Sequence, residues 1–279
     1  MRRVTPKVYT KKYYLTDCTG YNEYKKSLGE EFEPRFKEII KYFAIKPNTR
    51  VLDVGCGRGE MVLFAAKMRA EGFGIDYSKN AIALANSLKK GKPFVLQQKM
   101  HFLAMDAKCI KFADSYFDTV ILTDVIEHLY SEELEIVFKE IKRVLKNEGQ
   151  LIIHTAPNRL FNDYGYRYYS YPISTLIVSI WNIFNKNKYP NIEKSGKLRT
   201  DSHSIMHVNE PTYFSLQRLI KQYGFKGSIF SSNITVKKPI ISFKDSLFNF
   251  LVFFHPISRK FPLNVFFGSD FICILENIK

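Results

Sequence analysis

The segment that most restricts the fold is a short apolar stretch followed by three closely spaced glycines. Residues 50–54 (RVLDV) have the apolar, β-branched character of a buried strand, and residues 55–59 (GCGRG) follow directly. Residues 61–70 then have the apolar content of a packed helix. Glycines in such a turn let the chain bend sharply and let a ligand approach the backbone without meeting a Cβ. A strand, a glycine turn and a helix in this order predict a nucleotide-binding α/β domain.

The alternation of strands and helices continues beyond this unit. We expect strands at 73–76, 100–105, 117–122 and 150–154, a helix capped by Ser78, and a helix over 131–146 capped by Ser131. Glu132 and Glu133 suit the positive end of the second helix, whose apolar residues form one stripe. Strands alternating with helices predict a parallel sheet with helices on both faces.

Two aromatic-rich stretches interrupt this pattern in the second half of the chain. Five tyrosines between 164 and 171 precede an uncharged stretch and then a Lys-rich one, and residues 243–254 are again aromatic-rich. Between and after them we expect a helix over 212–223 and strands near 229–236 and 271–275. The sequence therefore predicts a doubly wound, mostly parallel seven-stranded α/β sheet over 46–279. Helical insertions are expected at about 160–205 and 240–268.

An acidic residue stands at the end of the second predicted strand. Asp76 lies 19 residues beyond Gly57, where a carboxylate can accept hydrogen bonds from both hydroxyls of a ribose. No Lys follows the glycines as it does in a phosphate-binding P-loop. The pattern therefore favours a nucleoside-containing ligand over a nucleotide triphosphate.

Residues 51–59 (VLDVGCGRG) resemble the first motif of class I S-adenosylmethionine-dependent methyltransferases. Dinucleotide-binding enzymes of related fold usually carry G-x-G-x-x-G and lack the preceding acid. Later family motifs are resembled, in order, by 74–78 (GIDYS), 105–107 (MDA), 124–129 (DVIEHL) and 145–151 (LKNEGQL), where Glu148 replaces a glycine. The resemblance implies S-adenosylmethionine as cofactor and methyl transfer as activity.

The same resemblance implies a set of cofactor-binding residues. Gly55 and Gly57 make room for the methionine moiety, Asp53 orients its ammonium group, and Asp76 binds the ribose. A sulfonium compound that carries a free amino acid needs carboxylate partners rather than a phosphate cradle, which suits these acids. The predicted set is completed by Cys56, Thr123, Tyr14 and, at the adenine, Tyr77, Asp106 and Ala107.

The region before the first strand resembles the N-terminal lid of bacterial and archaeal members of the family. Residues 13–21 (YYLTDCTGY) and 32–36 (FEPRF) provide the aromatic side chains and the Arg that close over the cofactor in such lids. We therefore expect a helical lid over residues 1–45. The alternative is that these aromatic residues only pack against the core.

The sequence says less about the part of the predicted site that would bind the methyl acceptor. The cofactor supplies the reactivity in methyl transfer, and a general base is needed only when the nucleophile carries a proton at neutral pH. His128, Asp124 and His207 are the candidate catalytic residues, with His128 as base or substrate contact. Glu127 and His154 are expected near them. The alternative for His128 is a structural role at the start of a helix.

A metal-dependent alternative follows from the same residues. Asp124, Glu127 and His128, with His203 or His207, resemble the metal site of RNA 3′-terminal 2′-O-methyltransferases, in which E-x-x-E-H and a distant His bind a divalent ion. Asp124 stands where that pattern has Glu, which shortens its reach. Similar pairs occur in many quinone- and glycan-modifying relatives. We therefore predict no metal and expect activity to survive chelators.

The net charge and the sequence motifs limit the classes of binding partner and methyl acceptor. The net charge of +15 favours anionic partners such as nucleic acid, a membrane surface or phosphorylated substrates. No Lys/Arg cluster is interleaved with a known nucleic-acid module, so an RNA methyltransferase is the second hypothesis. A non-catalytic cofactor-binding module is the third, and the acids at 53, 76 and 106 oppose it. The leading hypothesis is transfer to a small-molecule, glycan or lipid-linked acceptor, with O-methylation favoured because an N/D-P-P-Y motif is missing.

The first insertion contains an apolar helical face, which is followed by a basic stretch. This face suits an interfacial anchor beside an anionic lipid, or a substrate lid packed on the core. Its 12-residue apolar core is shorter than the roughly 20 residues that span a bilayer. We expect residues 160–205 to cover the acceptor pocket, and a cytoplasmic protein with peripheral contact at the inner membrane surface. The face consists of Ile173, Leu176, Ile177, Ile180, Trp181 and Phe184.

Overall fold

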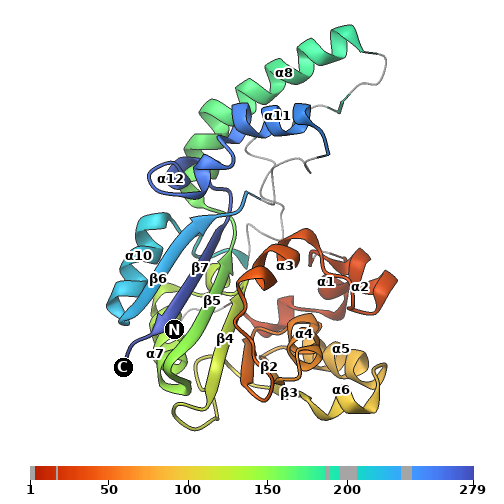
Figure 1. The fold of residues 1–279 in the computed structure, drawn as a ribbon, viewed down its shortest axis with the longest axis vertical. Helices are drawn as coiled ribbons and strands as arrows, with labels where there is room; N and C mark the ends of the chain where they lie inside the picture. The colour runs from red at the N-terminus through yellow and green to blue at the C-terminus, as the bar shows by residue number, and fades with distance from the viewer. Residues whose placement is uncertain (1–3, 17, 186–188, 191, 195–205, 234–240) are drawn as a thin grey trace.

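A seven-stranded sheet with helices on both faces forms the body of the protein (Figure 1). The computed structural model describes residues 4–16, 18–185, 189–190, 192–194, 206–233 and 241–279. The strand order is β3-β2-β1-β4-β5-β7-β6, in which β1 to β5 are parallel and β7 is antiparallel to both of its neighbours. The doubly wound α/β prediction is therefore confirmed. The strands are β1 (Arg50–Val54), β2 (Glu71–Asp76), β3 (Met100–Ala104), β4 (Phe117–Thr123), β5 (Leu145–Thr155), β6 (Phe225–Ser231) and β7 (Phe271–Asn277).

Alternate side chains of β1 enter the two layers of core that flank the sheet. Leu52 and Val54 pack in the cluster that contains α7 (Ser131–Val144) and α10 (Tyr213–Gln222). Val51 packs on the opposite face against α4 (Glu60–Lys67). Both faces of a parallel strand are thus buried, which explains why residues 50–54 are apolar almost throughout.

Two predicted helix ends need correction. Ser78 caps α5 (Lys79–Lys90) as expected, because its side chain accepts a hydrogen bond from the Ala81 N–H. Ser131, in contrast, is the first residue of α7, and Tyr130 is its N-cap. The Glu133 carboxylate accepts a hydrogen bond from the Tyr130 N–H at 3.2 Å and stabilises this helix start. The helix also ends at Val144 rather than Lys146, because β5 already begins at Leu145 and pairs there with Phe117.

Several short helices precede β1 and pack on the glycine-turn half of the sheet. They place Tyr9 and Tyr14 against Ala81 of α5, and Phe32 and Phe36 against the core beside α4. Helices are thus present before β1, and the lid role of residues 1–45 stays a prediction. These elements are η1 (Pro6–Val8), α1 (Lys11–Thr16), α2 (Tyr21–Ser27), α3 (Pro34–Ile39) and η2 (Ile40–Tyr42), and α6 (Phe94–Gln98) lies between α5 and β3.

The two predicted insertions meet in space and form one projection, which we call the helical arm. It comprises η4 (Phe161–Ser170), α8 (Tyr171–Phe184), α11 (Phe243–Phe253), η6 (Ile257–Arg259) and α12 (Asn264–Phe267). Figure 1 shows α8 and α11 side by side, projecting away from the sheet. Phe161 and Tyr166 from the first insertion pack with Val252 and Phe253 from the second. Among the described residues, no helix is long and apolar enough to cross a membrane.

Candidate functional site

A cavity of about 280 Å³ lies where β1, β2 and β4 end at the carboxyl edge of the sheet. The strand order reverses between β1 and β4, and ligands of open α/β sheets bind at such switch points. All the predicted cofactor-binding and catalytic residues line this one cavity, although they come from segments far apart in the sequence. They are Asp53, Gly55, Cys56, Gly57, Asp76, Tyr77, Asp106, Ala107, Thr123 and Tyr14, with His128, Asp124 and His207.

The glycine turn has the backbone conformation that requires glycine. Gly55 and Gly57 have φ angles of 76° and 50°, in the left-handed region. A Cβ at Gly55 would lie 2.6 Å from Cγ2 of Val125, so no larger residue fits without movement. The Gly57 N–H donates a hydrogen bond to Oδ2 of Asp76 at 3.1 Å. The turn and the end of β2 are therefore joined directly at the cavity wall.

Asp76 is held in place by two backbone donors. Besides the Gly57 N–H, the Ser78 N–H donates to Oδ1 at 2.8 Å, and the residue is buried. Burial raises the pKa of Asp76 to about 6, and the two backbone hydrogen bonds oppose that rise. The carboxylate is thus fixed in orientation before a ligand arrives, which suits recognition of a pair of hydroxyls.

Asp53 is a buried acid whose hydrogen-bonding capacity is incompletely used. Its Oδ1 atom has no hydrogen-bond partner in the described part of the chain, and the residue lines the cavity. Burial raises the pKa of Asp53 to about 8, reinforced by the charges of Glu60 and Asp76. An unmatched buried carboxyl group gains most from a cationic hydrogen-bond donor. This site therefore fits the ammonium group of an amino acid ligand.

The opposite end of the cavity is formed by residues that follow β2 and β3. The Asp106 carboxylate accepts a hydrogen bond from the Lys108 N–H at 2.9 Å, and its other oxygen lies 3.2 Å from Lys108 Nζ. The Tyr77 ring packs against Tyr9 with centroids 5.4 Å apart, and its hydroxyl donates to the Val4 carbonyl at 3.4 Å. The N-terminal segment therefore contacts the residues predicted to meet the adenine.

Arg58, which the sequence analysis did not single out, ties the N-terminal helices to the glycine turn. The Arg58 guanidinium is buried and donates hydrogen bonds to the carbonyls of Tyr14 at 2.9 Å and Thr19 at 2.7 Å. It also donates to Glu60 Oε1 at 3.0 Å. In the sequence, the indication of this role is that Arg58 stands between two glycines of the turn. The backbone carbonyls that accept its hydrogen bonds cannot be recognised from a sequence.

A chain of ion pairs extends from Arg35 and Asp124, which line the cavity, through His154 to Asp270, the residue before β7. Arg35 forms ion pairs with Glu33 and with Asp124, which adopts the left-handed φ of 53°. His154 Nδ1 lies 2.7 Å from the other Asp124 oxygen, and His154 Nε2 lies 3.3 Å from Asp270 Oδ2. Burial opposes ionisation of Asp124, but Arg35 and His154 hold its pKa below the usual range. His154, expected near the acceptor, thus lies behind Asp124 and outside the cavity lining of the described residues.

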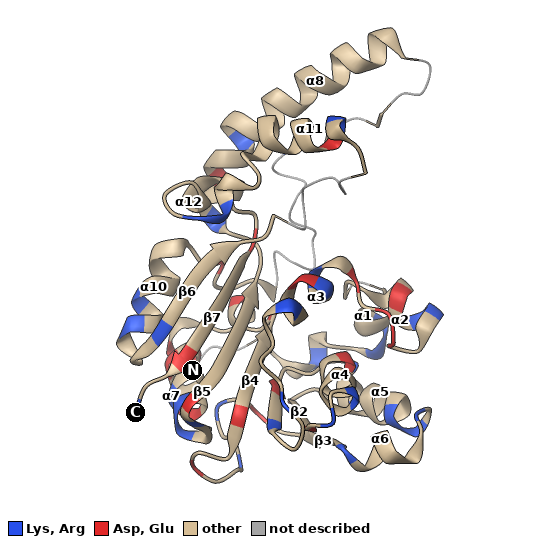
Figure 2. Cartoon of the chain, viewed as in Figure 1, with Lys and Arg blue, Asp and Glu red and all other residues tan. Residues whose placement is uncertain are grey.

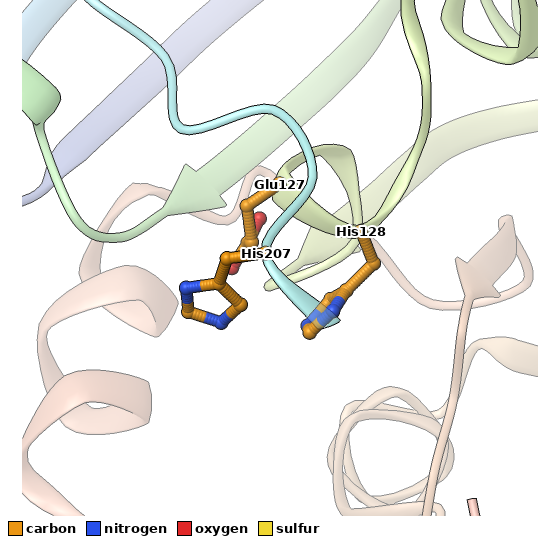
Figure 3. A group of neighbouring side chains, drawn as sticks. All are labelled: Glu127, His128 and His207. Atoms are coloured by element: carbon orange, nitrogen blue, oxygen red, sulfur yellow. The ribbon is translucent and has the colours of Figure 1, made fainter. Parts of the chain in front are cut away.

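Glu127, His128 and His207 form a compact cluster on the cavity wall (Figure 3). One ligand atom of each lies within 4.8 Å of the others. His128 Nδ1 lies 3.2 Å from the Met206 carbonyl oxygen, and the Thr155 hydroxyl donates to Glu127 Oε2 at 2.9 Å. Burial, with Asp124 nearby, raises the pKa of Glu127 above its usual range. His203, the other predicted candidate, lies outside the described residues.

The described part of the first insertion does not have the predicted lid role. No described residue between 161 and 194 lines the cavity, and the helical arm instead projects away from the sheet (Figure 1). Ala156 and His207, on either side of the insertion, do line the cavity. The predicted position of the insertion beside the carboxyl ends of the strands therefore applies only to its start. The chain leaves β5 at Thr155, at that edge of the sheet. Of the predicted apolar face of α8, Ile173 and Ile177 pack with residues of α11 rather than over the cavity.

Comparison with known proteins finds similarity in the part of the chain that forms the cavity. A family model described as a methyltransferase domain matches residues 52–153. The chain is 26% identical over 200 residues to demethylmenaquinone methyltransferase of Lactobacillus johnsonii, covering 69% of this chain and 74% of that protein. It is 29% identical over 168 residues to a sterol 4-C-methyltransferase of Caenorhabditis elegans, covering 56% of this chain and about half, 48%, of that protein.

The fold is also found among solved structures. A putative S-adenosylmethionine-dependent methyltransferase from Listeria monocytogenes superposes with a TM-score of 0.55. The two chains are 16% identical, and the match covers 88% of this chain and 98% of the other. At this level of identity the similarity establishes the fold.

Proposed function

Because this chain is a class I S-adenosylmethionine-dependent methyltransferase, we propose that it transfers the methyl group to a hydroxyl of a small or lipid-like acceptor. Two relatives have names that specify lipid-like acceptors, a demethylmenaquinone and a sterol. The wall of the cavity supports such an acceptor, because Tyr9, Tyr13, Phe36 and Leu129 contribute apolar surface beside the polar cluster.

The cofactor is proposed to lie across the carboxyl ends of β1 and β2. Asp53 accepts a hydrogen bond from the ammonium group, and its unmatched buried oxygen supports this role. Asp76 accepts from the ribose hydroxyls, supported by the two backbone donors that fix its orientation. Tyr77, Asp106 and Ala107 contact the adenine. Cys56, Thr123 and Tyr14 complete the enclosure.

The observation that carries the proposed chemistry is the position of His128 in the same cavity as the glycine turn. The Met206 carbonyl can only accept, so its contact with Nδ1 assigns the proton to that nitrogen. Nε2 then has a lone pair. In the proposed step the acceptor oxygen attacks the methyl carbon, the carbon–sulfur bond breaks, and sulfur keeps the electron pair as a thioether. His128 Nε2 takes the hydroxyl proton, and His207 contacts the acceptor.

Asp124 acts in this proposal as a positioning residue rather than as the base. Its two oxygens are engaged by Arg35 and His154, and its pKa is held low, so it has little tendency to take a proton. It fixes Arg35 and thereby the start of α3 beside the cavity. This assignment differs from the catalytic role that the sequence suggested for Asp124.

Transfer of radiolabelled methyl groups tests the proposal. Purified enzyme and labelled S-adenosylmethionine are incubated with a lipid extract, an aqueous small-molecule fraction and total RNA from cells. We expect label in the lipid or small-molecule fraction, and mass spectrometry of the product identifies the methylated atom. We also expect His128→Asn to lower kcat by about 10²–10⁴-fold while cofactor affinity stays near the wild-type value. Label confined to RNA would refute the proposed acceptor class.

A second candidate function, metal-assisted methyl transfer, is favoured by the Glu127, His128 and His207 cluster. Two imidazoles and a carboxylate suit Zn²⁺ or Mn²⁺, and the contacts from Met206 and Thr155 orient two of these side chains as second-sphere partners do. A bound cation would polarise an acceptor hydroxyl. Under the leading proposal, turnover survives dialysis against EDTA. Loss of turnover that Mn²⁺ or Zn²⁺ restores, with RNA as the labelled acceptor, would place the second candidate first.

A further inference from the structure

The helical arm leaves two apolar stripes uncovered. Ile173 and Ile177 of α8 pack inward with the arm's own core. Further apolar residues on and beside the same helical face, which we call the outer stripe of α8, are exposed, with exposed fractions of 57% for Leu176, 49% for Ile180, 74% for Ile183 and 81% for Phe184. These residues are spaced at i, i+4, i+7 and i+8, which places them on one helical face.

The same spacing recurs on α11. Phe243, Leu247, Phe250 and Leu251 are each at least 41% exposed and again follow i, i+4, i+7 and i+8. Figure 2 shows that α8 carries no charged residue along its whole length. Large apolar side chains exposed in a row along one helical face suit a binding surface rather than scattered ordinary exposure.

Cations paired with aromatic rings lie on the arm. The Lys244 Nζ atom lies 5.0 Å from the centroid of the Trp181 ring, and the Arg167 guanidinium lies 5.3 Å from that of Tyr168. Amphipathic aromatic side chains and long cationic ones are the types that settle at the boundary between lipid chains and headgroups. The pairing therefore suits a surface that is apolar inside and anionic outside.

We propose that the helical arm is an interfacial anchor that inserts the outer stripes of α8 and α11 into the surface of an anionic lipid bilayer. The net charge of +15 favours an anionic surface and opposes pairing with a second, equally charged copy of the chain. α8 has 14 residues, fewer than the roughly 20 needed to span a bilayer, so it lies in the interface.

The arm begins beside the cavity. The chain passes from Ala156, which lines the cavity, to the start of the arm at Phe161 within five residues. Given the proposed lipid-like acceptor, on which this one point depends, membrane binding would bring the enzyme to the surface in which such an acceptor resides. Membrane binding itself requires no assumption about the acceptor.

Vesicle flotation of the full chain tests the anchor without an activity assay. We expect the wild type to float with vesicles of phosphatidylcholine and phosphatidylglycerol, and less with phosphatidylcholine alone or at high salt. The double variant Ile180→Asp, Ile183→Asp should bind at least about tenfold more weakly. The matched control is Phe94→Asp, Val95→Asp on α6, where both residues are about as exposed, at 70% and 67%. The control should float like the wild type.

Fluorescence provides a readout that does not depend on a variant. Trp181 on α8 is the one tryptophan of the sequence, so its emission should shift to the blue on binding anionic vesicles and be quenched by brominated lipid. Retained cofactor binding and melting temperature show that the Asp variant is folded, and Ile180→Ser, Ile183→Ser serves if it is not. An unshifted Trp181 emission with no flotation overturns the proposal. So does equal loss in the control, or a wild-type dimer that the arm variant converts to monomer without change in flotation.

Discussion

His154 Nδ1 lies 2.7 Å from Asp124 Oδ1, while the second ring nitrogen of His154 lies 3.3 Å from Asp270. His154 has no exposed surface, so burial opposes its positive charge. The two carboxylates more than offset this cost and raise its pKa to about 9, while the pKa of Asp270 is lowered. The chain of ion pairs thus runs from Glu33 through Arg35, Asp124 and His154 to Asp270, with two cations between three carboxylates. It links Arg35 at the cavity wall to the residue before β7, and each buried cation lies between two carboxylates.

The first prediction concerns the pH dependence of stability. The pKa of His154 rises from about 6.5 in the unfolded chain to about 9 in the fold. Protonation therefore stabilises the fold fully below pH 6.5, and this contribution is lost as pH rises towards 9. It is on the order of 3 kcal/mol. We expect the difference in unfolding free energy between wild type and His154→Gln to shrink over that range in urea titrations. A difference that stays constant with pH would contradict the assignment.

The second prediction concerns Asp76. Asp76→Ala should weaken binding of S-adenosylmethionine and its demethylated product, because each charge-assisted hydrogen bond lost is worth about 1.5–3 kcal/mol. It also leaves the Gly57 and Ser78 N–H groups without their acceptor. Isothermal calorimetry measures both affinities. Asp114→Ala, which removes a side chain that is 74% exposed, is the matched control. Equal affinities in the two variants would refute the ribose-binding role.

The third prediction is a proton released on cofactor binding. Asp53 has a pKa of about 8 without a ligand, so it is mostly protonated at pH 7. A bound ammonium group would favour the carboxylate and lower that pKa, so up to about one proton leaves the protein. Calorimetry in two buffers of different ionisation enthalpy should detect this proton, and affinity should rise between pH 7 and 8. Asp53→Asn should bind more weakly and release none. Proton uptake by the wild type would contradict the prediction.

Local sequence signals made it possible to predict that the glycine turn and Asp76 lie in one cavity. A sharp turn demands glycine, and the last residue of a parallel strand lies at the carboxyl edge of the sheet. The pairing of Arg35 with Asp124 spans 89 positions, and that of His128 with the Met206 carbonyl spans 78. Neither pair follows a periodic sequence pattern from which the contact could be predicted. The α8–α11 contact could not be predicted for another reason: the sequence shows one apolar face on α8, but not that α11 covers only Ile173 and Ile177 of it.

The last prediction concerns Arg58 and the N-terminal helices. Arg58→Met keeps the aliphatic stem but removes the donors to the Tyr14 and Thr19 carbonyls. Two hydrogen bonds from a charged group, each worth about 1.5–3 kcal/mol, then no longer hold α1 over the cavity. We expect faster tryptic cleavage at Lys11 and Lys12, and cofactor affinity at least about tenfold lower, while β1 to β5 stay folded.

A control variant tests whether loss of another arginine also changes the cleavage rate and the cofactor affinity. Arg50→Met removes a guanidinium that is 43% exposed and lies 3.9 Å from Glu71 at the start of β1, away from the cavity. We expect this variant to retain the wild-type cleavage rate and affinity. If Arg58→Met bound the cofactor as tightly as Arg50→Met does, the N-terminal helices would be packing elements rather than a lid. In that case Tyr14 would lose its proposed place in the cofactor site.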